Sequence, residues 1–150
     1  MRFFVLILFL LVSSLADAKS ASEARVVSLI NTFRASGARC NGAGGVKLSP
    51  MRWNNTLAKA AKTHALNMGS KKFVSHYYQG IGPRTRITRA GYSYSRMSEI
   101  IFLGSGGASR AVNWWKNSRI HCWAISNPLY TEVGAAQYNG AWVVVMARPK

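Results

Sequence analysis

Apolar residues in the stretch 20–37 recur every three or four positions, which is the spacing of a helix with one buried side. Val26, Ile30 and Phe33 fall on that side. A serine near the start can cap the first turn, and Gly37 can end the helix. We therefore predict that the first element of the fold is an amphipathic helix.

The next helical stripe is continuous and contains a histidine. It follows Asn54 or Asn55, and either side chain can accept hydrogen bonds from the first free N–H groups of a helix. The stripe consists of Leu57, Ala60, Ala61, His64, Ala65 and Met68. His64 is therefore expected on the buried face, as a core histidine bonded to a neighbour, with a role in a pocket as the alternative.

Shorter patterns follow along the chain. A short helix is predicted over residues 83–91, which begin with proline and end with glycine. Residues 97–103 are mostly apolar and predict a strand, and residues 108–116 predict a third helix. Trp115 should face inward from that helix. Trp114 is then expected either to line a cleft or a surface patch or to be partly buried under a loop.

The last part of the chain predicts a β-hairpin. Residues 131–138 and 141–147 flank the pair Asn139-Gly140, which is the strongest turn signal in the sequence. Because residues 143–145 are three valines, that strand should be covered on both faces. Helices around a few antiparallel strands predict an α/β fold, a three-layer α/β/α sandwich with a small, mainly antiparallel central sheet.

Residues 1–18 have the pattern of a secretory signal peptide. Arg2 precedes an apolar run over residues 3–15, and Ala16-Asp17-Ala18 offers small residues at the positions that a signal peptidase reads. The run is too short to span a bilayer comfortably, although a retained anchor is the alternative. We expect cleavage after Ala18, a single domain over residues 19–150, and a periplasmic or extracellular protein.

The chain is strongly basic, with 20 Lys and Arg against 4 Asp and Glu and a net charge of +16. Such a charge favours anionic partners. Because an exported protein meets envelope polymers and phospholipids first, we expect anionic envelope components, with peripheral membrane contact, rather than nucleic acid. The basic residues are scattered, and their clusters at 71–72 and at Arg84, Arg86 and Arg89 are interpreted as solvated surface.

The chain has two cysteines, Cys40 and Cys122. An even number in an exported chain favours a disulfide. The alternative is a Cys122 nucleophile beside His121, but adjacent side chains rarely meet.

Acidic residues are so scarce that the few in apolar contexts are expected to have partners. Glu99 and Glu132 lie in such contexts, and the histidines are the obvious candidates to pair with them.

Several segments, in order along the chain, resemble a bacterial CAP domain, the superfamily of cysteine-rich secretory proteins, antigen 5 and plant pathogenesis-related proteins. They read Leu57-Ala58-x-Ala60-Ala61-x-x-His64-Ala65-x-x-Met68, Phe73-x-Ser75-His76, Ala90-Gly91-Tyr92, Trp115-x-x-Ser118-x-x-His121-Cys122, Thr131-Glu132-Val133-Gly134 and Ala147-Arg148-Pro149. The resemblance implies a cleft that holds His76, Glu99, His121 and Glu132. It also implies a cysteine pair at Cys40 and Cys122. The family motif Gly-Glu-Asn is Ser98-Glu99-Ile100 here, and Ser118 replaces a glutamate of other branches.

The resemblance implies a binding module more than an enzyme. Two imidazoles, His76 and His121, can hold a zinc-like ion while a carboxylate orients one of them, and no cofactor is otherwise required. We expect a monomeric, non-enzymatic module whose cleft takes a metal, a lipid-like molecule or an envelope ligand. One alternative is a metal-assisted, peptidase-like hydrolase of the envelope. Another is that the His/Glu pairs are struts between loops.

Overall fold

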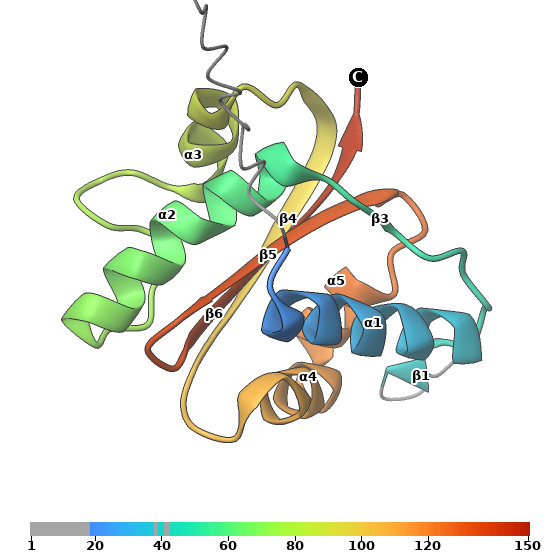
Figure 1. The fold of residues 1–150 in the computed structure, drawn as a ribbon. Helices are drawn as coiled ribbons and strands as arrows, with labels where there is room; N and C mark the ends of the chain where they lie inside the picture. The colour runs from blue at the N-terminus through green and yellow to red at the C-terminus, as the bar shows by residue number, and fades with distance from the viewer. Residues whose placement is uncertain (1–18, 38, 41–42) are drawn as a thin grey trace, which may run out of the picture.

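The computed structural model describes residues 19–37, 39–40 and 43–150, and the predicted signal peptide, residues 1–18, lies outside them. Figure 1 shows a sheet between two layers of helices, α1, α4 and α5 on one face and α2 and α3 on the other. The predicted α/β/α sandwich is therefore confirmed.

The helices of the described chain begin and end close to the predicted residues. They are α1 (Ala21–Ser36), α2 (Asn55–Lys71), α3 (Pro83–Ala90), α4 (Gly107–Lys116) and α5 (Arg119–Ile125). Ser20 caps α1 in a capping box with Glu23, and Asn54 caps α2. Gly37 and Gly91 end α1 and α3 in the left-handed conformation that glycine adopts without strain. The unexpected helix is α5.

The central sheet has the strand order β3-β5-β6-β4. The predicted hairpin consists of β5 (Glu132–Tyr138) and β6 (Ala141–Pro149), and β6 also pairs antiparallel with β4 (Tyr94–Leu103). A two-residue strand, β3 (Arg52–Trp53), pairs parallel with β5. The sheet is therefore small and mainly antiparallel, with β6 at its centre and β4 at one edge.

Each face of the sheet has its own hydrophobic core. On β6, Val144 packs under α1 and α4, whereas Val143 and Val145 pack under α2, so the valine run is covered on both faces as predicted. A Cβ at Gly134 of β5 would collide with the backbone of Leu57 and Ala58 in α2. This glycine therefore allows α2 to lie directly on the sheet.

A disulfide joins the short strand β1 to the helix α5. Cys40 lies in β1 (Arg39–Cys40), which pairs antiparallel with β2 (Ala43–Gly44). It is bonded to Cys122 in α5, with 5.7 Å between the two Cα atoms. The predicted bridge is confirmed, and it excludes Cys122 as a thiol nucleophile.

A buried arginine connects α1 to the segments around the disulfide. Arg34 is 3% exposed, and its guanidinium donates to the carbonyl oxygens of Ser49, Ile125, Asn127 and Tyr130 at 2.7 to 3.3 Å. Burial lowers its pKa. Sequence periodicity did not predict this role, because all four acceptors are backbone atoms distant in the chain.

None of the helices in the described residues is long and apolar enough to cross a membrane.

Candidate functional site

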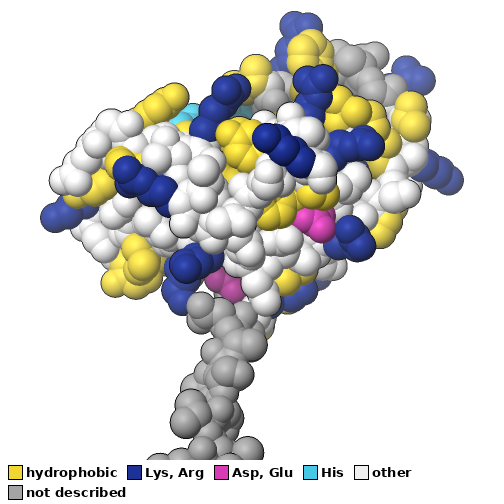
Figure 2. Space-filling view, turned by 90° about the horizontal axis from the view of Figure 1, so that it is seen from above, with side chains coloured by type: hydrophobic (Ala, Val, Ile, Leu, Met, Phe, Trp, Pro, Cys, Tyr) yellow, Lys and Arg dark blue, Asp and Glu magenta, His cyan; other side chains and the backbone are white. Residues whose placement is uncertain are grey.

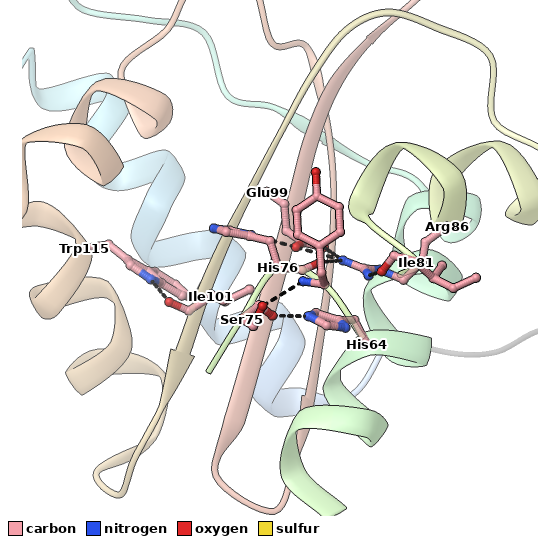
Figure 3. A network of polar contacts seen from close by, with 9 residues as sticks. His64, Ser75, His76, Ile81, Arg86, Glu99, Ile101 and Trp115 are labelled. Carbon is pink, nitrogen blue, oxygen red and sulfur yellow. Dashed lines mark hydrogen bonds and ion pairs between the residues drawn. The ribbon is translucent and has the colours of Figure 1, made fainter. Parts of the chain in front are cut away.

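The segment between α2 and α3 carries His76 and is fixed by His64. His64 is fully buried in α2, and its Nε2 donates to the carbonyl of Ser75 at 2.6 Å (Figure 3). The prediction of a core histidine bonded to a neighbour is confirmed. Burial lowers the pKa of His64, and the positive charge of Arg86 adds to that effect. His64 is therefore a neutral anchor for the loop that presents His76.

His76 is paired with Glu99, the glutamate of β4. The Nδ1 of His76 lies 2.9 Å from the Oε1 of Glu99, so the imidazole donates from Nδ1 to the carboxylate (Figure 3). The side chain of Glu99 is 1% exposed, whereas that of His76 is 42% exposed. The buried carboxylate thus orients a half-exposed imidazole through Nδ1 and leaves Nε2 outside this bond.

Arg86 of α3 completes this group. Its Nη2 donates to both oxygens of Glu99 at 2.8 and 2.9 Å and to the carbonyl of His76, while Nη1 donates to the carbonyl of Ile81 (Figure 3). The assignment of Arg86 to the solvated surface was wrong, since its side chain is 4% exposed. The available signal was its position next to Ile87, within the apolar side of a short helix.

His121 comes from the opposite helical layer. Its Nδ1 and the hydroxyl of Ser118, the residue before α5, are 2.7 Å apart, and its ring lies 5.0 Å from the ring of Trp114. Burial lowers the pKa of His121, and electrostatic interaction with His76 lowers it further. The two histidines therefore sense each other electrostatically, although they belong to different layers.

Glu132 belongs to a second polar group. Its carboxylate accepts from Arg52 at 3.2 Å, from Asn54 at 3.1 Å and from the hydroxyl of Tyr92 at 2.6 Å. The expectation that a histidine pairs with Glu132 was therefore wrong. Burial and the nearby carboxylate raise the pKa of Tyr92. Tyr92 and Asn54 were missed because neither belongs to a motif with a stated chemistry.

The two glutamates nevertheless share a face of the sheet. Glu99 of β4 lies beside Val145 of β6, which lies beside Gly134 of β5, two residues from Glu132. Alternate residues of a strand share a face, and this face is the one covered by α2 and α3. The structure therefore brings together His76, Glu99 and Arg86. Glu132 belongs to a separate cluster, and the printed contacts of His121 are with Ser118 and Trp114.

The small number of metal-ligating side chains limits what the site around His76 and His121 can bind. Among the described residues, no group of three or more His, Cys, Asp and Glu side chains could hold a metal ion. Two imidazoles can supply at most part of a zinc coordination sphere, and the remainder would come from water or a bound molecule. The contact of Ser118 with His121 adds a hydroxyl beside an imidazole.

Comparisons with known proteins agree with the architecture. Residues 27–146 match the CAP family, described as the cysteine-rich secretory protein family. The chain is 29% identical over 123 residues to the Uncharacterized protein YkwD of Bacillus subtilis, covering 81% of this chain and 44% of that one. It is 30% identical over 89 residues to an uncharacterized protein of Borreliella burgdorferi, covering 59% of this chain and 57% of that one. The chain thus spans about half the length of these curated relatives.

Solved structures show the same fold. An extracellular protein containing a SCP domain from Bacillus anthracis aligns with a TM-score of 0.76 and 20% identity, over 85% of this chain and 40% of that chain. An outer surface protein from Borrelia burgdorferi aligns with a TM-score of 0.74 and 24% identity, over 89% of this chain and 96% of that chain. With the family match over residues 27–146, these findings establish that the chain belongs to the CAP, or cysteine-rich secretory protein, family.

Proposed function

We propose that this CAP domain is an exported, non-enzymatic binding module that holds its ligand at His76 and His121. The observation that supports the proposal most is the bond between the half-exposed His76 and the buried Glu99, which Arg86 fixes in turn. An imidazole oriented in this way presents Nε2 in one direction, which lowers the entropy that a ligand must lose on binding.

A zinc-like ion fits this site in part. His76 can offer Nε2, and Glu99 would act on the ring opposite the metal, as carboxylates do in histidine metal sites. His121 is a suitable second ligand, because its lowered pKa keeps the imidazole neutral at pH 7 and a metal binds the neutral form. Further positions would be available to water or to an envelope ligand that brings its own donor atoms.

The module is proposed to act in the cell envelope. The net charge of +16 favours anionic molecules, and two structural neighbours are described as an extracellular and an outer surface protein. A lipid-like or anionic envelope component, bound by a monomer, is the partner class that this charge suits.

Calorimetric titration with zinc at pH 7.5 tests the site. The protein without residues 1–18 should bind one ion, and His76→Ala and His121→Ala should each weaken binding by about tenfold or more, since each removes a ligand. Glu132→Gln is the matched control, because Glu132 bonds Arg52, Asn54 and Tyr92 and should leave the heat unchanged. Equal heats from the wild type and His76→Ala would rule out metal binding at this site.

Hydrolysis in the envelope is the second candidate, and one contact favours it. The hydroxyl of Ser118 lies 2.7 Å from Nδ1 of His121, within the reach of a nucleophile and its base. A metal held by two histidines would also leave positions for a reactive water. Hydrolysis of a casein or peptidoglycan substrate by the zinc-loaded protein, lost in both Ser118→Ala and His76→Ala, would favour this candidate over pure binding.

A further inference from the structure

Three large apolar side chains are exposed where α4 meets α5. Trp114 is 47% exposed, Ile120 is 72% exposed and Trp123 is 44% exposed. We define the α4–α5 patch as these three residues together with Arg110 and Arg119. It lies beside the proposed ligand site, because the ring of Trp114 contacts that of His121.

Each tryptophan of the α4–α5 patch has an arginine four residues before it. Arg110 precedes Trp114 in α4, and together they border a hollow of about 520 Å³ that Ser118 also lines. The guanidinium of Arg119 lies 4.4 Å from the ring centroid of Trp123. Residues four apart share a helix face, so each pair presents an indole and a cation in the same direction.

The α4–α5 patch keeps its positive charge. The acidic residues of the described chain are Glu23, Glu99 and Glu132. Glu23 is bonded to Ser20 at the start of α1, Glu99 is buried against Arg86, and Glu132 pairs with Arg52. None of these carboxylates is bonded to Arg110 or Arg119, so both guanidinium groups are available to external anions.

We propose that the α4–α5 patch docks this protein peripherally on a bilayer that contains anionic phospholipids. Tryptophan is favoured at the boundary between headgroups and acyl chains, where its ring is buried and its N–H stays hydrated. Arginine binds phosphate groups in a bidentate manner. The exposed Ile120 decides between partners, because an acyl-chain boundary gains from burying it, whereas a nucleic acid or a soluble polyanion would leave it in water.

This inference names the partner of the proposed binding module and rests on that proposal. Docking would bring His121 close to the lipid surface, since Trp114 belongs both to the patch and to the surroundings of His121. Zinc binding in the absence of vesicles does not depend on the patch. The two proposals therefore fail separately.

Vesicle sedimentation of the protein without residues 1–18 is the test. The protein should bind vesicles of phosphatidylcholine with about a quarter phosphatidylglycerol and bind pure phosphatidylcholine vesicles much more weakly. Ile120→Ser with Trp123→Ser, and separately Arg110→Gln with Arg119→Gln, should each reduce binding by about tenfold or more. Circular dichroism and zinc titration confirm that each variant remains folded.

Matched controls separate the patch from the overall charge. Leu66→Ser with Tyr138→Ser removes two exposed apolar residues elsewhere, and Arg84→Gln with Arg89→Gln removes two exposed cations from α3. Both controls should bind vesicles nearly as well as the wild type. Lipids brominated near the glycerol should quench tryptophan fluorescence, and less so after Trp123→Ser. Equal losses in patch and control variants, absence of quenching, or equal affinity for soluble polyphosphate would overturn the proposal.

Discussion

The three histidines occupy three different environments, and the difference decides which of them can meet a ligand. His64 is fully buried, and its Nε2 donates a hydrogen bond to the carbonyl of Ser75. His76 is hydrogen-bonded to Glu99 through Nδ1, and Nε2 does not take part in this bond. His121 is bonded to Ser118 through Nδ1. Two of the three imidazoles therefore keep a ring nitrogen for an external partner, and the third is structural.

The buried His64 should make stability depend on pH. Its pKa is lowered in the fold from an ordinary 6.5, so the unfolded chain takes up a proton first as the pH falls below 6.5. The free energy of unfolding should be at its full value above pH 6.5 and should decrease as the pH falls toward the lowered pKa, with His121 acting in the same direction. In urea denaturation, His64→Gln should flatten this slope between about pH 7.5 and 5. Thr63→Val is a non-titrating change on the same helix and should leave the slope unchanged. An equal dependence of the unfolding free energy on pH in both variants would contradict the account.

The pair of Glu99 and Arg86 should be the most sensitive charge pair of the fold. Glu99→Gln leaves a guanidinium that is 4% exposed without an opposite charge, which should cost about 3 kcal/mol of the free energy of unfolding. Glu132→Gln is the control, since its partner Arg52 is 78% exposed and the loss should be about 1 kcal/mol or less. Equal losses of unfolding free energy in the two variants, measured by chemical denaturation, would mean that the buried pair contributes no more to stability than the exposed one.

At the scale of elements, Gly134 determines how α2 rests on the sheet. Gly134→Ala would place a methyl group against the backbone of Leu57 and Ala58, which cannot move without shifting the helix, and should cost about 3 kcal/mol. Gly104→Ala meets only the ring of Phe102, which can rotate away. Its cost in thermal unfolding should be well below that of Gly134→Ala, and the reverse order would contradict the role assigned to Gly134.

The disulfide joins α5 to the segment after α1. Its removal should lower the free energy of unfolding without changing ligand binding. Cys40→Ser with Cys122→Ser should lower the free energy of unfolding by about 4 kcal/mol for a separation of 82 residues, and the melting temperature by several degrees or more. Zinc heats should stay unchanged. A reducing agent should reproduce the shift in the wild type, and a melting curve insensitive to reduction would count against the bridge.

Elements with strong local signals could be predicted, and elements that depend on distant contacts could not. The caps at Ser20 and Asn54 and the turn at Asn139-Gly140 are encoded by neighbouring residues, so their helices and hairpin appear where expected. The short helix α5 and the strand β3 have few residues and little periodicity, and they are held by the disulfide and by pairing with β5. The buried Arg86 was missed because its carboxylate partner, Glu99, belongs to another element, the edge strand β4.

At the scale of the molecule, the cations on the face seen in Figure 2 are dispersed rather than gathered in one cluster. Figure 2 shows Lys and Arg side chains dispersed over the visible side, with few acidic groups among them. Uniform positive charge gives attraction to anionic surfaces without orientation. Orientation would have to come from exposed apolar residues, which is the role proposed for the α4–α5 patch.

The residues of the proposed ligand site come from both helical layers and from the edge strand β4. Glu99 lies in the edge strand β4, His76 comes from the α2–α3 side, and His121 comes from α5 on the other side. Both histidines thus depend on the complete sandwich, which explains why no short motif of the sequence contains the site.

The most direct test of this account is a ¹⁵N NMR titration of the three imidazoles with zinc. Before zinc, His76 should carry its proton on Nδ1, because that nitrogen donates to Glu99, and His64 should carry its proton on Nε2. With zinc, the Nε2 signal of His76 and a ring nitrogen of His121 should shift together at one equivalent, while both nitrogens of His64 stay in place. If His76 carries its proton on Nε2, or zinc leaves its signals unchanged, the claim that Glu99 orients a ligand-binding histidine is wrong.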